Sequence, residues 1–242
     1  MLHKLGPYDF LANLMPGLAF LWAIQWLCQF FGGPTLLPVA GSLAETSILI
    51  AWGFLAGLLL QGIAQGIVEK EILAISGGFP SARLLSDGDP GLSPEYRIRL
   101  KEAIADYFQV PVEPTVGKTT SEKEEKKVRL KRYQELFYLC YNLVEQKKLS
   151  DRPLAFNAQY GLFRGLFTLS LILLVLFGLA VVLRWDVVSV QGSRGLFSWI
   201  TLFLFGASFI SFLRMRKRGQ DFARSVYDLF FTYYRQEKFA AK

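Results

Sequence analysis

The stretch FLAGLLLQGIAQGIVEKE, Phe54 to Glu71, decides how this chain folds. It is apolar enough to lie in a membrane as a helix, and its closing charges mark an exit into water. Two glutamines four residues apart, Gln61 and Gln65, interrupt the apolar run. Amides at such positions either line a wet path for ions or hydrogen-bond to a neighbouring helix, and the sequence leaves both interpretations open.

The composition around this stretch indicates a protein that is partly in a membrane and partly in water. Of 242 residues, 52% are hydrophobic and 15% aromatic, yet 19% are charged. Crossing a bilayer takes roughly 20 apolar residues in a helix. Four segments approach this length: residues 14–31, 47–68, 166–183 and 196–213. We therefore expect an all-α polytopic membrane protein with four transmembrane helices in two hairpins.

These spans divide the chain into four parts. Residues 1–68 would form the first transmembrane hairpin, 69–160 a helical cytoplasmic insert, 161–213 the second hairpin and 214–242 a basic cytoplasmic tail helix. Apolar residues recur at helical spacing in the insert and in the tail. Because the insert is short for a core of its own, we expect it to pack on the tail helix or on another subunit. The clearest stripe comprises Tyr133, Leu136, Phe137, Cys140, Leu143 and Val144.

The orientation follows from the distribution of lysine and arginine, which accumulate on the cytoplasmic side. The link between the first two spans has neither residue, and the link between the last two has only Arg184 and Arg194. Residues 67–160 have fifteen, and the tail after Leu213 has eight. We therefore predict a multi-pass protein of the plasma (inner) membrane with both termini in the cytoplasm.

The net charge of +7 is concentrated beside the membrane. The basic cluster Arg214, Arg216, Lys217 and Arg218 follows the last span directly. Such clusters attract anionic lipid headgroups. We therefore expect the lipid bilayer to be the partner of this cluster and expect no nucleic-acid binding.

The polar and small residues of the first two spans form the main candidate site. Gly53 and Gly57 fall on one arc of the second span, Gly62 and Gly66 lie nearly opposite, and the glutamines lie between them. Small residues let helices approach closely in a bilayer, so this span should have neighbours on two sides. The residues predicted to line a pore or pack helices are Gln25, Gln29, Gly53, Gly57, Gln61, Gly62, Gln65 and Gly66.

A second polar stripe lies where the third span enters the membrane. It contains Asn157, Tyr160 and Arg164. These residues either anchor the helix at the interface, with the arginine reaching toward water, or line a vestibule or an inter-subunit contact. No acidic, basic or histidine residue lies deep in any span, which disfavours proton-coupled transport.

Catalysis and metal binding are poorly supported. The only histidine is His3, and no phosphate-binding loop, serine nucleophile motif or carboxylate cluster is present. We therefore expect no enzymatic activity, no catalytic residue, no metal site and no cofactor. Cys28 and Cys140 fall in different parts of the predicted topology, so we expect no disulfide.

Three motifs carry a resemblance to known proteins. PYDFLANLMPG, GGFPSARLL and FNAQYGLFRGL together resemble motifs of uncharacterised bacterial four-span membrane proteins with this spacing of hairpin, insert and hairpin. The organisation, a few spans with a cytoplasmic module, is also similar to that of membrane-disrupting effectors of antiphage defence systems.

The sequence supports two hypotheses about function. In the first, the protein is a homo-oligomeric ion channel or pore that is lined by the second span. Its cytoplasmic helices gate the pore on a protein or small-molecule signal. The resemblance to antiphage effectors implies that such a pore would act in defence. In the second, it is a membrane-anchored adaptor or scaffold whose cytoplasmic helices bind a partner.

Overall fold

The computed structural model describes residues 7–37, 41–67, 78–114, 121–183 and 194–240. Within these ranges the chain is all helical, with seven helices and no strand. It divides into two compact units. Unit 1 comprises Met1–Lys70 and Ala158–Met215, and unit 2 comprises Glu71–Asn157 and Arg216–Lys242. The predicted all-α class is confirmed for the described residues.

Three of the described helices are long and apolar enough to cross a membrane, and these indicate a membrane protein. They cover Leu43–Ile67, Asp151–Leu179 and Gly195–Ala240. The expected fourth span, residues 14–31, is not among them, so the prediction of four spans is corrected to three. That segment lies in α1, Pro7–Phe30, where Asn13, Gln25, Gln29 and the internal Pro16 lower the hydropathy.

Helix α2, Leu43–Ile63, begins before the predicted start of its span at residue 47. Ser42 caps it: the Ser42 hydroxyl accepts from the Glu45 amide at 3.2 Å, and Glu45 Oε2 accepts from the Ser42 amide at 2.8 Å. This reciprocal pair is a capping box, which satisfies amides that a helix start leaves unpaired. At its other end the helix widens into a π-turn over residues 64–67.

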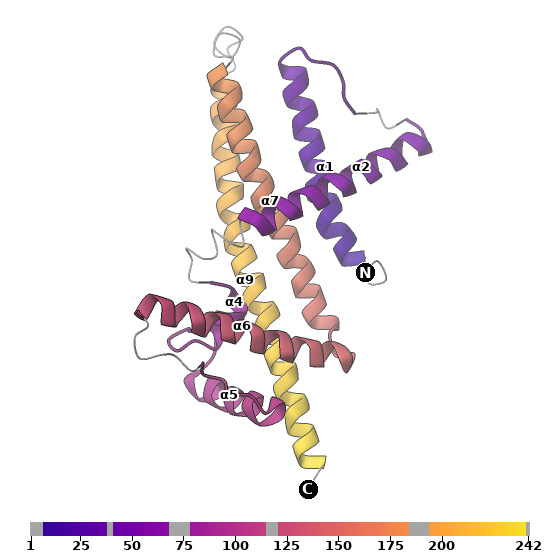
Figure 1. Cartoon of the computed structure of the whole chain (residues 1–242). Helices are drawn as coiled ribbons and strands as arrows, with labels where there is room; N and C mark the ends of the chain where they lie inside the picture. The colour runs from indigo at the N-terminus through magenta and orange to yellow at the C-terminus, as the bar shows by residue number, and fades with distance from the viewer. Residues whose placement is uncertain (1–6, 38–40, 68–77, 115–120, 184–193, 241–242) are drawn as a thin grey trace. The chain divides into compact units, whose positions relative to one another are not determined.

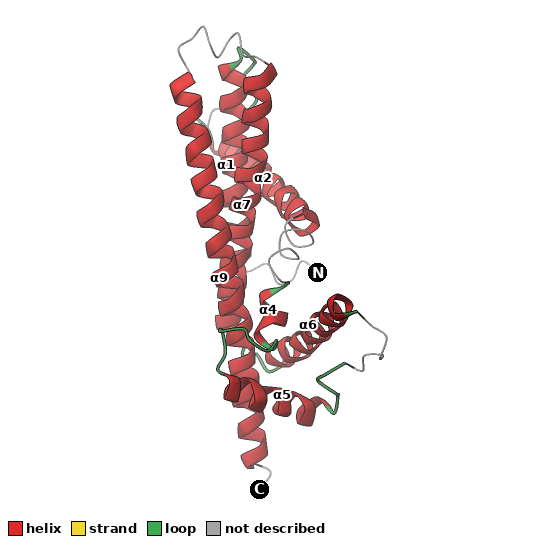
Figure 2. Cartoon of the chain, turned by 90° about the vertical axis from the view of Figure 1, so that its left-hand side faces the viewer, coloured by secondary structure: helices red, strands yellow, loops and turns green. Residues whose placement is uncertain are grey.

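Helices α7, Asp151–Leu183, and α9, Arg194–Ala240, contribute residues to both units. In unit 1 they lie side by side and antiparallel (Figures 1 and 2). The Phe167 and Phe212 ring centroids are 5.5 Å apart, and those of Phe177 and Phe197 are 5.8 Å apart. Trp26 of α1 stacks on Phe177 at 5.7 Å, so α1 closes an aromatic cluster at this end of the pair.

Unit 2 contains α4, Pro80–Leu84, α5, Pro94–Phe108, and α6, Glu122–Gln146, together with the start of α7 and the end of α9. Ser93 caps α5, because its hydroxyl accepts from the Tyr96 amide at 3.3 Å. Ser121 caps α6 in the same way at 3.4 Å from the Glu124 amide.

The core of unit 2 forms where α6 meets the end of α9. All six residues of the predicted α6 stripe are buried, and Tyr227 and Phe230 of α9 are fully buried against them in one cluster. The expectation that the insert packs on the tail helix is therefore confirmed. The stripe predicted from helical spacing alone identified this core because one apolar face of α6 has to leave water.

A buried arginine fixes the start of α5. Arg97 is 5% exposed, and its guanidinium donates to the carbonyl oxygens of Leu84 at 3.1 Å, of Leu92 at 3.1 Å and of Asp89. Buried charge is tolerated when hydrogen bonds satisfy it. These three bonds tie the loop between α4 and α5 to the first turns of α5, and so position the exposed side chains that follow on that helix.

A polar network in unit 2 joins α5 to α6. Lys101 Nζ donates to Glu113 Oε1 at 2.8 Å, and the buried Tyr133 hydroxyl donates to the same oxygen at 2.8 Å. Partial burial would raise the pKa of Glu113, but the hydrogen bonds from Lys101 and Tyr133 outweigh it and hold the pKa below 4.5. Glu113 is therefore a carboxylate that stabilises unit 2 in its ionised form.

Candidate functional site

The polar cluster of unit 1 forms around Gln61, near the end of α2. The Arg164 guanidinium of α7 donates to Gln61 Oε1 from Nε at 2.9 Å and from Nη2 at 2.7 Å. Gln61 Nε2 donates to the Gly161 carbonyl oxygen at 2.8 Å. Both ends of the amide are therefore bound to the neighbouring helix, one turn apart on α7.

Two glycines of α7 create the space for this amide. A Cβ at Gly165 would lie 3.2 Å from Gln61 Nε2 and 3.0 Å from Pro16 Cγ, and one at Gly161 would lie 3.8 Å from the Ala12 Cβ. Any side chain at Gly165 would therefore push against both α1 and α2. The close approach that glycine permits is what brings Gln61 within hydrogen-bond distance of the α7 backbone.

A second set of glycines joins α1 to α2 where the two helices cross (Figure 1). A Cβ at Gly17 would overlap the Gly53 carbonyl oxygen, and a Cβ at Gly57 would overlap the Asn13 carbonyl oxygen. Gly53 and Gly57 are buried, as expected of helix-packing residues. The backbones touch here because no side chain separates them.

Arg164 brings a positive charge into an apolar span. Its guanidinium lies 5.5 Å from the centroid of the Tyr160 ring, in the range of a cation–π contact. Charged residues in spans are usually paired and face the protein. Here Arg164 is half-buried and donates two hydrogen bonds to the Gln61 amide oxygen. The arrangement satisfies polar groups between helices by hydrogen bonding and contains no nucleophile with an adjacent base.

The other predicted glutamines are placed differently. Gln25 Oε1 accepts from the Leu36 amide at 2.6 Å and the Leu37 amide at 3.0 Å, so it secures the chain that follows α1. Gln29 and Gln65 are exposed. The repeated spacing of the two glutamine pairs therefore does not give four equivalent side chains.

The second face of α2 is open. Gly62 and Gly66 are exposed, and a Cβ added at either would meet no atom within 4 Å. In the described residues this face therefore has no packed neighbour, unlike the face that carries Gly53 and Gly57. The prediction of two packed sides holds within this single chain for one side only.

The remaining predicted residues do not join the cluster. Asn157 is exposed, whereas Tyr160 and Arg164, further along the same helix, are half-buried. In the basic cluster, Arg214 and Lys217 are exposed, while Arg218 pairs with Asp221 at 3.1 Å. Part of that cluster therefore serves an intrahelical ion pair.

The spacing of residues did not reveal the link between Gln61 and Arg164. Both residues belong to predicted polar groups, but the two groups are about a hundred residues apart, and no local pattern reports such a distant contact. The two glycines spaced by four on α7, Gly161 and Gly165, were the available signal, since small residues at that spacing mark close helix contacts.

No metal-binding group of three His, Cys, Asp or Glu side chains occurs in the part of the chain that the structure describes. Comparison with protein-family models, with curated proteins and with solved structures finds no match. The resemblances to four-span membrane proteins and to defence effectors stay predictions.

Proposed function

We propose that the protein is a membrane-anchored binding protein, in which unit 1 holds the chain in the bilayer and unit 2 meets soluble partners on the cytoplasmic side. The observation that carries the proposal is the engagement of both ends of Gln61 by α7. An amide bound in this way packs helices, and its oxygen, the atom that would bind a cation, already accepts two hydrogen bonds.

The outward faces of unit 1 support an anchoring role. Large apolar side chains of α2 and α9 are exposed, as suits contact with lipid tails. They include Leu55, Leu59, Trp199, Phe203, Phe205, Phe209 and Ile210. Unit 2, in contrast, buries its own cluster of apolar residues and carries most of the described charges outside it, as expected of a module in water.

A homo-oligomeric channel remains the second candidate, and one observation favours it. Gln65 is exposed on α2 close in sequence to Gly62 and Gly66, which have open space around them. Small residues beside an amide suit contact with a second copy of the chain. A path between copies would then be lined by Gln65 rather than by Gln61.

Ion flux through liposomes distinguishes the two candidates. The purified protein is reconstituted as wild type and as Gln65→Leu, and the subunit mass is measured in the same detergent. The anchor proposal expects sealed liposomes and a monomer. Flux that the wild type supports and Gln65→Leu alters would overturn the anchor in favour of a channel. Empty liposomes and a Gln25→Leu variant, which changes a loop contact instead, serve as controls.

A further inference from the structure

Two adjoining hollows lie between α5 and the end of α9 in unit 2. Their volumes are about 370 Å³ and 420 Å³, and they share Arg99, Phe231 and Arg235. Each is within the size range of small-molecule sites in proteins. Arg97 fixes the first turns of α5 through three backbone carbonyls, so Arg99 extends from a helix end that is held in place.

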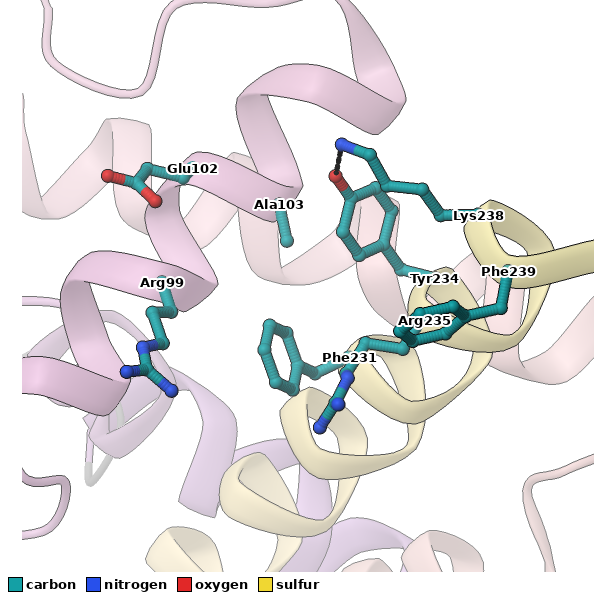
Figure 3. Close-up of a pocket in the computed structure, with 8 residues that line it drawn as sticks. All are labelled: Arg99, Glu102, Ala103, Phe231, Tyr234, Arg235, Lys238 and Phe239. Atoms are coloured by element: carbon teal, nitrogen blue, oxygen red, sulfur yellow. Dashed lines mark hydrogen bonds between the residues drawn. The ribbon is translucent and has the colours of Figure 1, made fainter. Parts of the chain in front are cut away.

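Several charged groups around these hollows are already engaged. Lys238 Nζ donates to Asp106 at 3.0 Å and to the Tyr234 hydroxyl at 2.7 Å, the bond drawn in Figure 3. Asp228 accepts from the Tyr96 hydroxyl at 2.7 Å. These bonds join α5 to α9 beside the hollows. The side chains that form them are therefore already engaged within the protein.

Arg99 and Arg235 are different. Among the described residues, neither guanidinium forms a hydrogen bond or an ion pair with an acidic side chain. Arg235 lies 5.9 Å from the centroid of the Phe239 ring. Figure 3 shows the two guanidinium groups on either side of the Phe231 ring. These two arginines and the rings of Phe231 and Phe239 therefore line one opening, together with the engaged Lys238 and Tyr234.

This combination selects a chemical class of ligand. Guanidinium groups match phosphate geometry with paired hydrogen bonds, and aromatic side chains stack on flat rings. Glu95 and Glu102 also line the hollows, and carboxylates accept hydrogen bonds from hydroxyl or amino groups. We propose that Arg99 and Arg235 bind the phosphate of a small molecule that carries a flat aromatic ring, the chemistry of a mononucleotide.

This inference rests on the proposed function in one respect, since it names a ligand for the unit that faces water. Its test is separate, because binding in detergent requires neither flux nor a second copy. A failure here would leave the anchor proposal standing, and flux through liposomes would leave this site standing.

The test is calorimetric titration of the full chain in a maltoside detergent, which carries no phosphate. The probes are AMP, ribose 5-phosphate, adenosine and inorganic phosphate. We expect AMP to bind most tightly and Arg99→Gln or Arg235→Gln to weaken it about 10- to 100-fold, as expected for loss of hydrogen bonds to a charged group. Arg129→Gln is the matched control, because Arg129 is an exposed arginine of unit 2 at a different hollow.

Each alternative outcome overturns the proposal. Absence of AMP binding would do so, as would binding that both arginine variants leave unchanged. If ribose 5-phosphate bound as tightly as AMP, the aromatic ring of the ligand would contribute nothing to binding. A lipid headgroup shares the phosphate, so nanodiscs with and without phosphatidylglycerol form the last arm. If phosphatidylglycerol raised the unfolding temperature of the wild type but not of Arg99→Gln, and AMP did not bind, the arginines would be assigned to the membrane surface.

Discussion

Replacing Gln61 with leucine tests whether the amide stabilises unit 1. The change removes three hydrogen bonds, two from Arg164 and one to Gly161. At the average of about 0.6 kcal/mol for such bonds in a bilayer protein, the loss is about 2 kcal/mol. For a protein of this size that corresponds to a fall of about 4–8 °C in the unfolding midpoint. Gln65→Leu should change it by under about 2 °C, because substitutions at exposed sites are usually near neutral.

Tryptophan fluorescence follows this transition selectively. All five tryptophans, at positions 22, 26, 52, 185 and 199, fall within the sequence ranges of unit 1. Thermal unfolding in detergent therefore reports on that unit. The assignment of Gln61 to helix packing would be refuted if Gln61→Leu lowered the midpoint no more than Gln65→Leu. A double-mutant cycle with Arg164→Leu adds a second criterion, since partners in contact give non-additive losses.

Two other variants probe separate contacts. Gly57→Ala should destabilise unit 1 by about 3 kcal/mol, because the added methyl overlaps the Asn13 carbonyl. Gly62→Ala should leave the stability of unit 1 unchanged, because the space around Gly62 is open. Equal fluorescence midpoints for the two variants would contradict this prediction. Because the Glu113 pKa is held below 4.5, its contribution to stability is present above that pH and is lost as the pH falls further. Glu113→Gln should therefore lower the stability of unit 2 at pH 7 and make that stability less dependent on acid pH. The measurement is the thiol reactivity of Cys140 in a Cys28→Ser background. If the variant kept the acid dependence of the wild type, groups other than Glu113 would control the acid stability of unit 2.

The helices of unit 2 were predictable because local rules determine them. Ser93 and Ser121 begin helices by capping amides next to them in sequence, and the apolar face of α6 repeats at helical spacing. The early start of α2 at Leu43 was also readable, since Ser42 and Glu45 have capping-box spacing. Hydropathy alone does not reveal this early start, because the polar residues in the first turn of the helix resemble a loop.

The contacts of the candidate site were less accessible. That Gln61 binds Arg164 depends on how α2 and α7 pack, and the sequence indicates that packing only indirectly, through the small residues Gly161 and Gly165. The same holds for Arg99 and Arg235, which lie on helices far apart in the chain and meet only when α5 packs on α9. The error in counting spans has a local cause: the aromatic content of α1 concealed how much its amides and proline reduce its apolar character.

The end of α9 supplies Ala223, Val226, Tyr227 and Phe230 to the middle of the unit 2 core. During synthesis, α5 and α6 are made well before these residues. Their apolar faces therefore have no final packing partner until the ribosome has translated residues 216–240, a period in which exposed apolar surface invites aggregation or chaperone binding. A nascent chain stopped before residue 216 would present that surface permanently, which makes it a substrate for quality-control proteases.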